Sequence, residues 1–308
     1  MPVRTQPFAS IGGGRPEGED NARAEILDHV NRVHGTNYAL VAQLSGGYRS
    51  GAHLVRDRIG REAVLKHSPD PIWAHHVQRT GPVIATARDA GWPTPAWLTV
   101  GTTDTGHLYH LQERVAGASP ERLTTPMARQ ALPIIDWQRG RAPDTDQNWS
   151  AHDHAVVFAG EAGLLAAIRR HSPAGSAFTQ AVRSSLQPYR GCMLPVSDLV
   201  HGDFSPDNVL LDNEQLTAII DAEAAGRGSR FHDLASLSAH GTLWDADPEA
   251  EVLLRGYARR HARPGEFEIS LAAAFITILA SHITIHGDPD DADELFIAAT
   301  RRCANLGR

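Results

Sequence analysis

The chain has 308 residues, of which 42% are hydrophobic, and carries a formal net charge of −7 at pH 7. This length allows two lobes of ordinary domain size, each with its own core. The negative charge argues against the broad basic surface that nucleic-acid binders need, so nucleic acid is not expected as a partner. The two cysteines, Cys192 and Cys303, lie far apart. They predict neither a disulfide framework nor a zinc site, which fits a reducing cytoplasm.

The N-terminal segment 1–20 is rich in Gly, Pro and polar residues, and we expect it to be a flexible lead-in. It lacks the uninterrupted apolar core of a signal peptide. The most apolar later stretch, 269–285, is interrupted by Ser, Thr and His residues. The sequence therefore predicts no membrane span and a cytoplasmic protein.

Residues 21–115 predict a β-rich N-lobe. Helical spacing of apolar residues and alternating patterns give these elements in chain order: a helix over 21–34, strands over 38–44, 52–56 and 62–67, a helix over 74–90, and strands over 96–100 and 107–114. Short polar or glycine turns join the first three strands, so they pair antiparallel. We expect a five-stranded antiparallel sheet with a helix.

Residues 116–308 predict a larger, mostly helical C-lobe. Helices are expected over 126–138, 153–170, 174–186, 233–240, 248–261, 267–286 and 291–305, with short strands within 199–220. The segment 115–120 would be the hinge. A β-rich front and an α-rich back make a bilobal α+β fold.

The densest group of polar residues lies in LVHGDFSPDNVLLD, residues 199–212, followed by IIDAE at 219–223. Apolar residues flank each polar cluster, so each cluster should end a short strand that faces a cleft. Phosphoryl transfer needs a carboxylate near the attacking hydroxyl and hard oxygen ligands for the magnesium on the phosphates. Asp203, Asn208 and Asp221 supply that set.

The strings HGDFSPDNVLL and IIDAE are similar, position for position, to the pattern H-G-D-x-x-x-x-N and I-D-x-[ED] of the aminoglycoside phosphotransferase and choline kinase superfamily. The resemblance implies a protein-kinase-like fold, in which the N-lobe, 21–115, binds nucleotide and the C-lobe, 116–308, holds the catalytic and substrate-binding groups. It implies that Asp203 is the catalytic base and that His201 braces the catalytic loop. It also implies that Asn208 and Asp221 bind Mg²⁺. In FHDLA, Asp233 resembles the aspartate that holds this loop in place.

The glycine-rich turn SGGYRSG precedes the one lysine among the 29 Lys and Arg residues. Gly46, Gly47, Ser50 and Gly51 lie between two predicted strands, where backbone N–H groups can meet phosphates. Lys66 ends the third strand and resembles the lysine that pairs the α- and β-phosphates in this fold. In an arginine-dominated chain, a retained lysine favours a site that needs a compact ammonium group.

The segment YHLQERVAG resembles the family segment whose backbone meets the purine edge, which implies contacts from the Glu113 carbonyl and the Val115 N–H. Because these contacts come from the backbone, the side chains in this segment do not indicate whether ATP or GTP is the donor. The family's helix glutamate is absent, because Thr80 stands at the position that would align. The acid that pairs with Lys66 is therefore open. Either another acid holds Lys66, or Asp221 and phosphate alone hold it. Glu223 is read separately, as a salt-bridge partner or as a residue behind the metal ligands.

These features predict Mg²⁺-dependent transfer of the γ-phosphate of ATP or GTP to a small-molecule hydroxyl. The resemblance favours an antibiotic as acceptor, giving resistance or self-protection of a producer. One alternative is a metabolic kinase for choline, homoserine or a sugar. Another is a nucleotide-binding pseudokinase, against which the presence of the base, both metal ligands and the lysine argues. A monomer or homodimer is expected.

Overall fold

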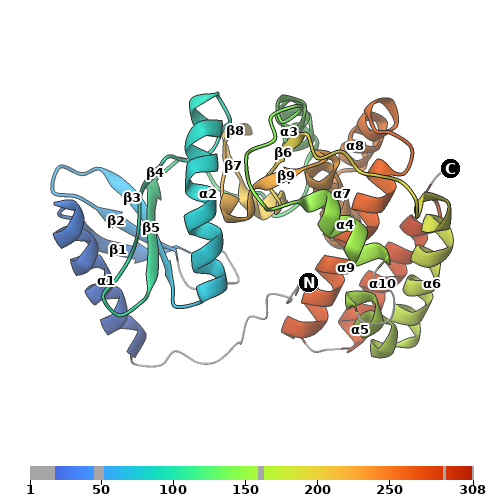
Figure 1. Cartoon of the computed structure of the whole chain (residues 1–308), viewed down its shortest axis with the longest axis horizontal. Coiled ribbons are helices and arrows are strands. Elements are labelled where there is room, and N and C mark those ends of the chain that lie inside the picture. Colours follow the sequence, from blue (N-terminus) through green and yellow to red (C-terminus); the bar gives the residue numbers. More distant parts are fainter. Residues whose placement is uncertain (1–17, 45–51, 159–162, 287–288, 307–308) are drawn as a thin grey trace.

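The computed structural model describes residues 18–44, 52–158, 163–286 and 289–306, which form two lobes (Figure 1). The N-lobe sheet is antiparallel throughout, in the order β1-β2-β3-β5-β4. This confirms the predicted five-stranded sheet and the bilobal α+β fold. The N-lobe comprises α1 (Gly18–His34), β1 (Ala39–Gln43), β2 (His53–Arg56), β3 (Glu62–Ser68), α2 (Pro71–Asp89), β4 (Trp97–Thr102) and β5 (Leu108–Glu113).

Alternation along the strands gives the sheet two differently used faces. On one face, Tyr109 and Leu111 pack in a core with Val30 of α1. On the other face, His110 lies against Trp73 of α2, with ring centroids 5.9 Å apart. Lys66 is directly opposite His110 in the β3–β5 register, and α2 stands between the sheet and the C-lobe (Figure 1). The sheet thus presents its only lysine on the side of the second lobe.

The C-lobe is built from helices around two short two-stranded antiparallel sheets, β6-β9 and β7-β8, of which only β7-β8 is a hairpin. Its helices are α3 (Thr125–Trp137), α4 (Trp149–Phe158), α5 (Leu164–His171), α6 (Pro173–Leu186), α7 (Phe231–Trp244), α8 (Pro248–His261), α9 (Glu266–His286) and α10 (Pro289–Cys303). Its strands and 3₁₀ turns are η2 (Gln187–Tyr189), β6 (Asp198–Val200), η3 (Pro206–Asn208), β7 (Val209–Asp212), β8 (Gln215–Ile219), η4 (Ala222–Ala224) and β9 (Gly226–Gly228).

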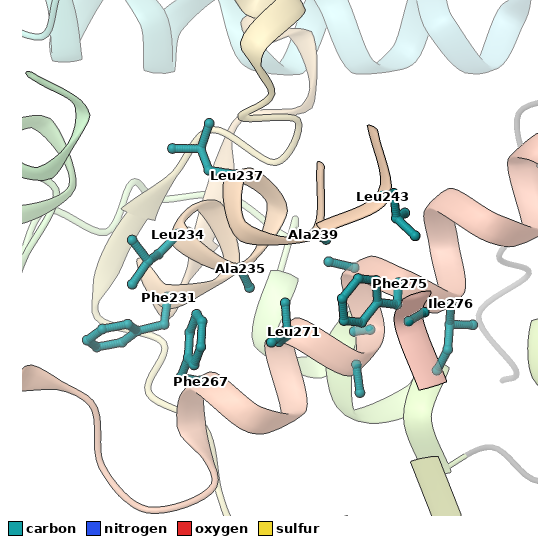
Figure 2. Packing of buried hydrophobic residues seen from close by; sticks show 14 of the residues in the cluster. Phe231, Leu234, Ala235, Leu237, Ala239, Leu243, Phe267, Leu271, Phe275 and Ile276 are labelled. Carbon is teal, nitrogen blue, oxygen red and sulfur yellow. The ribbon is translucent and has the colours of Figure 1, made fainter. Parts of the chain in front are cut away.

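The centre of the C-lobe is the contact between α7 and α9 (Figure 2). Phe231 and Leu237 of α7 and Leu271 and Phe275 of α9 are all buried. Of the described helices, α9 alone is long and apolar enough to cross a membrane by length and composition, and 56% of that window is buried inside the protein. A helix that is apolar on all sides suits the middle of a large core.

The single helix predicted over 153–170 is wrong. The structure has two helices there, α4, which ends at Phe158, and α5, which begins at Leu164. Gly163 is the N-cap of α5, with an extended backbone that cannot continue a helix from the preceding residues. The apolar spacing on both sides of the break matches one helical period, which hides the break in the sequence.

A backbone pairing lies next to the predicted hinge between the lobes. After β5 the chain pairs with β7, since Ala118 and Leu211 exchange two backbone hydrogen bonds of 2.9 Å. Gly117 has φ +128°, and a Cβ there would lie 2.9 Å from the Leu211 carbonyl oxygen, so this approach requires glycine. We propose that the N-lobe ends at residue 115 and the C-lobe begins at residue 116.

An apolar cluster fixes α2 against the C-lobe. Ile84 and Ala87 of α2 pack with Trp92, and this group meets Leu199 of β6 and Ala222 of η4. All five side chains are buried. The helix that covers the N-lobe sheet is therefore also part of the contact with the segment that carries Asp221.

Candidate active site

Asp233, at the start of α7, holds the backbone of the loop that follows β6. Its fully buried carboxylate accepts hydrogen bonds from the His201 N–H at 2.7 Å and the Gly202 N–H at 3.0 Å. Gln138 Nε2 donates a third bond of 2.6 Å. Hydrogen bonds to a charged acceptor are strong, so this clamp fixes the loop firmly. The predicted bracing role of Asp233 is confirmed.

The His201 ring braces the same loop from inside. Its Nε2 donates to the Ile220 carbonyl at 2.9 Å, and its Nδ1 accepts the Asp203 N–H at 3.2 Å. Because a carbonyl only accepts and an amide only donates, the ring is neutral with its proton on Nε2. His201 therefore ties the Asp203 backbone to the strand that leads to Asp221.

Asp203 and Asn208 lie together at the end of this loop. Asn208 Nδ2 donates to the Asp203 carbonyl oxygen at 2.8 Å and to Asp203 Oδ2 at 3.0 Å. Asp203 keeps one side open to solvent, yet the crowding of protein atoms around it raises its pKa above 3.8, and the Asp221 carboxylate acts in the same direction. A carboxylate with a raised pKa is a better proton acceptor than an ordinary aspartate.

Lys66 reaches across from the N-lobe to two acids of the C-lobe. Its Nζ lies 2.5 Å from Asp221 Oδ1 and 2.8 Å from Glu223 Oε1. Burial by itself would lower the pKa of Lys66, but these two carboxylates raise it above its usual value. The lysine is thus charged, and the open question of its partner is answered by the Asp221–Glu223 pair.

Asp221 occupies the left-handed region of the backbone, with φ 61° and ψ 40°. A non-glycine residue held there is uncommon and marks a position that the surrounding structure determines. The turn lets Asp221 and Glu223 both face Lys66 although they are only two residues apart.

Thr80 of α2 secures the same turn. The fully buried Thr80 hydroxyl donates to the Glu223 carbonyl oxygen at 2.8 Å. His110 Nε2 lies 3.6 Å from Glu223 Oε1. Burial and the Lys66 charge hold the His110 pKa well below its usual range, so this contact is not an ion pair. Helix α2 thus supports the turn that carries Glu223 through a neutral hydroxyl group.

The donor atoms at this site fit Mg²⁺ bound together with phosphates. The Asn208 amide nitrogen is committed to Asp203, which leaves its oxygen as the ligand atom, and Asp221 has a second carboxylate oxygen besides the one on Lys66. Over the described ranges, no group of three His, Cys, Asp or Glu side chains could hold a metal ion. Asn208 and Asp221 offer one free oxygen atom each, which suits an ion whose other ligands would come from nucleotide and water.

The N-lobe residues predicted to contact nucleotide are only partly tested. Gly46, Gly47, Ser50 and Gly51 lie outside the described residues. The Glu113 N–H bonds to the Ala96 carbonyl at 2.8 Å, and its side chain accepts from Arg88. The purine contacts of the Glu113 carbonyl and the Val115 N–H stay predictions.

Sequence reasoning missed two residues that support the loop. Gln138 bonds to Asp233 across a separation of 95 residues. Trp149 packs on Gly202, where a Cβ would overlap its indole ring. No local pattern marks Gln138 or Trp149, since each acts only through a distant partner. The one available signal was the glycine of H-G-D, which indicates that another group packs closely on the loop at that position.

Comparisons with known proteins agree with this geometry. The family described as "Phosphotransferase enzyme family" matches residues 41–267, and the search of curated proteins found no match. Among solved structures, aminoglycoside phosphotransferase APH(4)-Ia is similar with a TM-score of 0.67 and 21% identity, covering 92% of this chain and 100% of that one. The type VIII aminoglycoside-3'-phosphotransferase has a TM-score of 0.57 and 18% identity, covering 81% and 98%.

APH(3'')-Id from Streptomyces rimosus, in complex with ADP and streptomycin, has a TM-score of 0.51 and 18% identity, covering 82% of this chain and 98% of that one. At these identities the solved structures establish the fold. The family match covers well over half of the chain. The chain therefore belongs to the phosphotransferase enzyme family and is a small-molecule phosphotransferase with a hydroxyl acceptor.

Proposed function

We propose that the protein transfers the γ-phosphoryl group of ATP or GTP, with Mg²⁺, to a hydroxyl of an antibiotic. The observation that carries the transfer reaction is the meeting of two groups of side chains. Lys66 joins Asp221 and Glu223 across the lobes, and Asp203 with Asn208 stands on the loop beside them. Positioned charge of this kind is most of what phosphoryl transfer requires.

Each side chain has a distinct part in the proposed reaction. Asp203 orients the acceptor hydroxyl and takes its proton, which its raised pKa favours. Asn208 and Asp221 would hold Mg²⁺, which when bound neutralises charge on the phosphates. Lys66 carries a fixed positive charge toward the α- and β-phosphates. Glu223 keeps Lys66 in place when Asp221 serves the metal.

An antibiotic acceptor is supported by what the similar structures contain. APH(4)-Ia is described in a ternary complex with AMP-PNP and hygromycin B, at 21% identity and a TM-score of 0.66. APH(3'')-Id is described with ADP and streptomycin. The two antibiotics, hygromycin B and streptomycin, carry several hydroxyl groups each, so an aminoglycoside-like polyol is the first class of acceptor to test.

We also propose that the enzyme works in the cytoplasm, as a monomer or homodimer, without nucleic acid or membrane. Two features support this. Cys192 and Cys303 are free thiols, and burial raises the pKa of Cys303 to about 12, so this thiol is unreactive. The apolar helix α9 is packed inside the C-lobe.

The direct test is transfer of label from γ-labelled ATP or GTP to a panel of acceptors in the presence of Mg²⁺. The panel holds aminoglycosides, other hydroxylated antibiotics, choline, homoserine and simple sugars. Labelled antibiotic is the expected result. Label on a metabolite alone would move the protein to metabolic kinases. Nucleotide binding with no labelled acceptor and no hydrolysis would make it a pseudokinase.

A further inference from the structure

A buried chain of polar side chains runs behind the catalytic loop. Ser270 of α9 donates to Asp153 Oδ2 at 2.7 Å, and His232 Nδ1 of α7 donates to Asp153 Oδ1 at 2.9 Å. Ser270, Asp153 and His232 are 0%, 1% and 7% exposed. Helices α7 and α9 thus both bond to Asp153 of α4, and His232 of this group immediately precedes Asp233.

This histidine is charged at neutral pH. Burial would lower the pKa of His232, but the Asp153 carboxylate outweighs it and Asp233 adds to the effect, so the pKa rises to about 9. A hydrogen bond to the backbone of Gly202 also favours the charged ring. The other titratable group that faces it, His152 of α4, has its pKa lowered by burial and is neutral. His232 is thus a cation with one ring nitrogen on Asp153 and the other toward Gly202.

Trp149 extends this contact to both parts of the active site. Its ring lies 4.5 Å from the His232 ring, centroid to centroid, and it covers the face of Gly202 where any side chain would collide. Its Nε1 donates to the Ala224 carbonyl oxygen at 2.9 Å, at the end of the turn that follows Asp221. An indole over an imidazolium ring is a favourable cation–π arrangement.

We infer that the Asp153–His232 pair is a positioning device for the catalytic loop, in which the His232 ring, bonded to Asp153, and Trp149, which packs on Gly202, fix Asp203 relative to Asp221. This inference rests on the proposed function, because Asp203 is the residue being positioned. His232 is buried and acts through the loop, so it is a positioning residue. Loss of its proton removes one of its two donors, and either Gly202 or Asp153 then loses its partner.

The pH dependence follows in direction and range. The folded-state pKa, about 9, lies above the ordinary 6.5, so stabilisation by this pair is complete below pH 6.5 and is lost as pH rises through 9. We expect kcat to fall along the same alkaline limb. The KM for nucleotide should stay constant there, because Lys66 remains charged to higher pH.

The experiment compares His232→Gln, Asp153→Asn and a control, His154→Gln, in the full-length enzyme. His154 lies next to Asp153 on α4, and its Nε2 lies 3.2 Å from a different backbone carbonyl, that of Arg190. The first readout is kcat and KM for nucleotide from pH 6 to 10, by acceptor phosphorylation or by slow hydrolysis of ATP. The second is the nitrogen shifts of the His232 ring and the Gly202 amide by NMR.

We expect His232→Gln to lower kcat on the order of tenfold, leave KM within about twofold, and abolish the alkaline limb. His154→Gln should keep the limb. In the wild-type enzyme the Gly202 amide should titrate with the His232 ring near pH 9. A neutral His232 ring at pH 7, or an alkaline limb that persists in both His232→Gln and Asp153→Asn, would overturn the inference.

The NMR titration of the wild-type protein decides the case even if His232→Gln does not fold. It also separates this inference from the proposed function. If no acceptor is phosphorylated but Gly202 titrates with His232, the positioning device stands and the assigned reaction fails. If phosphorylation occurs and Gly202 does not respond to the ring, the reaction stands and the device fails.

Discussion

The two lobes contribute unequally to the active site. The C-lobe supplies the carboxylates and the amide, and buried hydrogen bonds hold them: Asp233 clamps the loop of Asp203, and His201 joins that loop to the strand before Asp221. The N-lobe supplies one cation, Lys66, whose two partners both belong to the C-lobe. The C-lobe half of the site is therefore built within one core, whereas the N-lobe half depends on how the lobes meet.

This difference changes the role of α2. A helix acid would keep the lysine partner within the N-lobe, but here α2 has Thr80 and an apolar surface against the C-lobe. The position of Lys66 is thereby coupled to packing between the lobes. Substitutions in the C-lobe half should affect chemistry, and those at the lobe contact should mainly affect nucleotide binding.

The largest effect is expected from Asp203→Asn, which removes the base from the C-lobe half. We expect kcat to fall on the order of 10²–10⁴-fold, the usual contribution of a positioned general base. Because the pKa of Asp203 is raised on folding, its ionisation costs stability above pH 4, so the variant should melt no lower than wild type at pH 7. Asp207→Asn, in the same loop, is the control and should keep its turnover. Unchanged kcat in Asp203→Asn would contradict the assignment.

Asp233→Ala tests whether the C-lobe half is built as one unit. It leaves the buried N–H groups of His201 and Gly202 without an acceptor, so the free energy of unfolding should drop by on the order of 3 kcal/mol. Chemical denaturation measures this change. A loss under about 0.5 kcal/mol would show that the loop is held by other contacts.

Glu223→Gln tests the lobe contact. Lys66 keeps Asp221 but loses one of its two negative partners, so we expect the KM for nucleotide to rise roughly three- to tenfold with a smaller change in kcat. Steady-state kinetics with varied nucleotide gives both values. A large fall in kcat at constant KM would place Glu223 in the chemical step.

Thr80→Val should have the smallest effect. The change keeps the shape of the side chain and removes the hydrogen bond to the Glu223 carbonyl, which costs about 1 kcal/mol of stability. The KM for nucleotide should rise less than threefold. A Thr80→Val variant as impaired in nucleotide binding as Glu223→Gln would mean that the helix, and not the ion pair, positions Lys66.

The difference between the lobes also separates what the sequence could predict from what it could not. Asp203, Asn208 and Asp221 stand in one short segment at fixed spacing, and Lys66 is the sole lysine and lies in an apolar strand. Local pattern was therefore enough to single out these four residues. The pairing of Lys66 with Glu223 spans 157 residues and depends on packing between lobes. The helix predicted over 153–170 failed because the periodicity continues on both sides of Gly163.

The division of labour between Asp203 and Asp221 is the central claim, and calorimetric titration of a non-hydrolysable ATP analogue with and without Mg²⁺ tests it most directly. Asp203→Asn should bind the analogue as wild type does and retain the full increase in affinity that Mg²⁺ brings. Asp221→Asn should lose that increase. The account is contradicted if Asp221→Asn keeps the Mg²⁺-dependent increase, or if Asp203→Asn loses it.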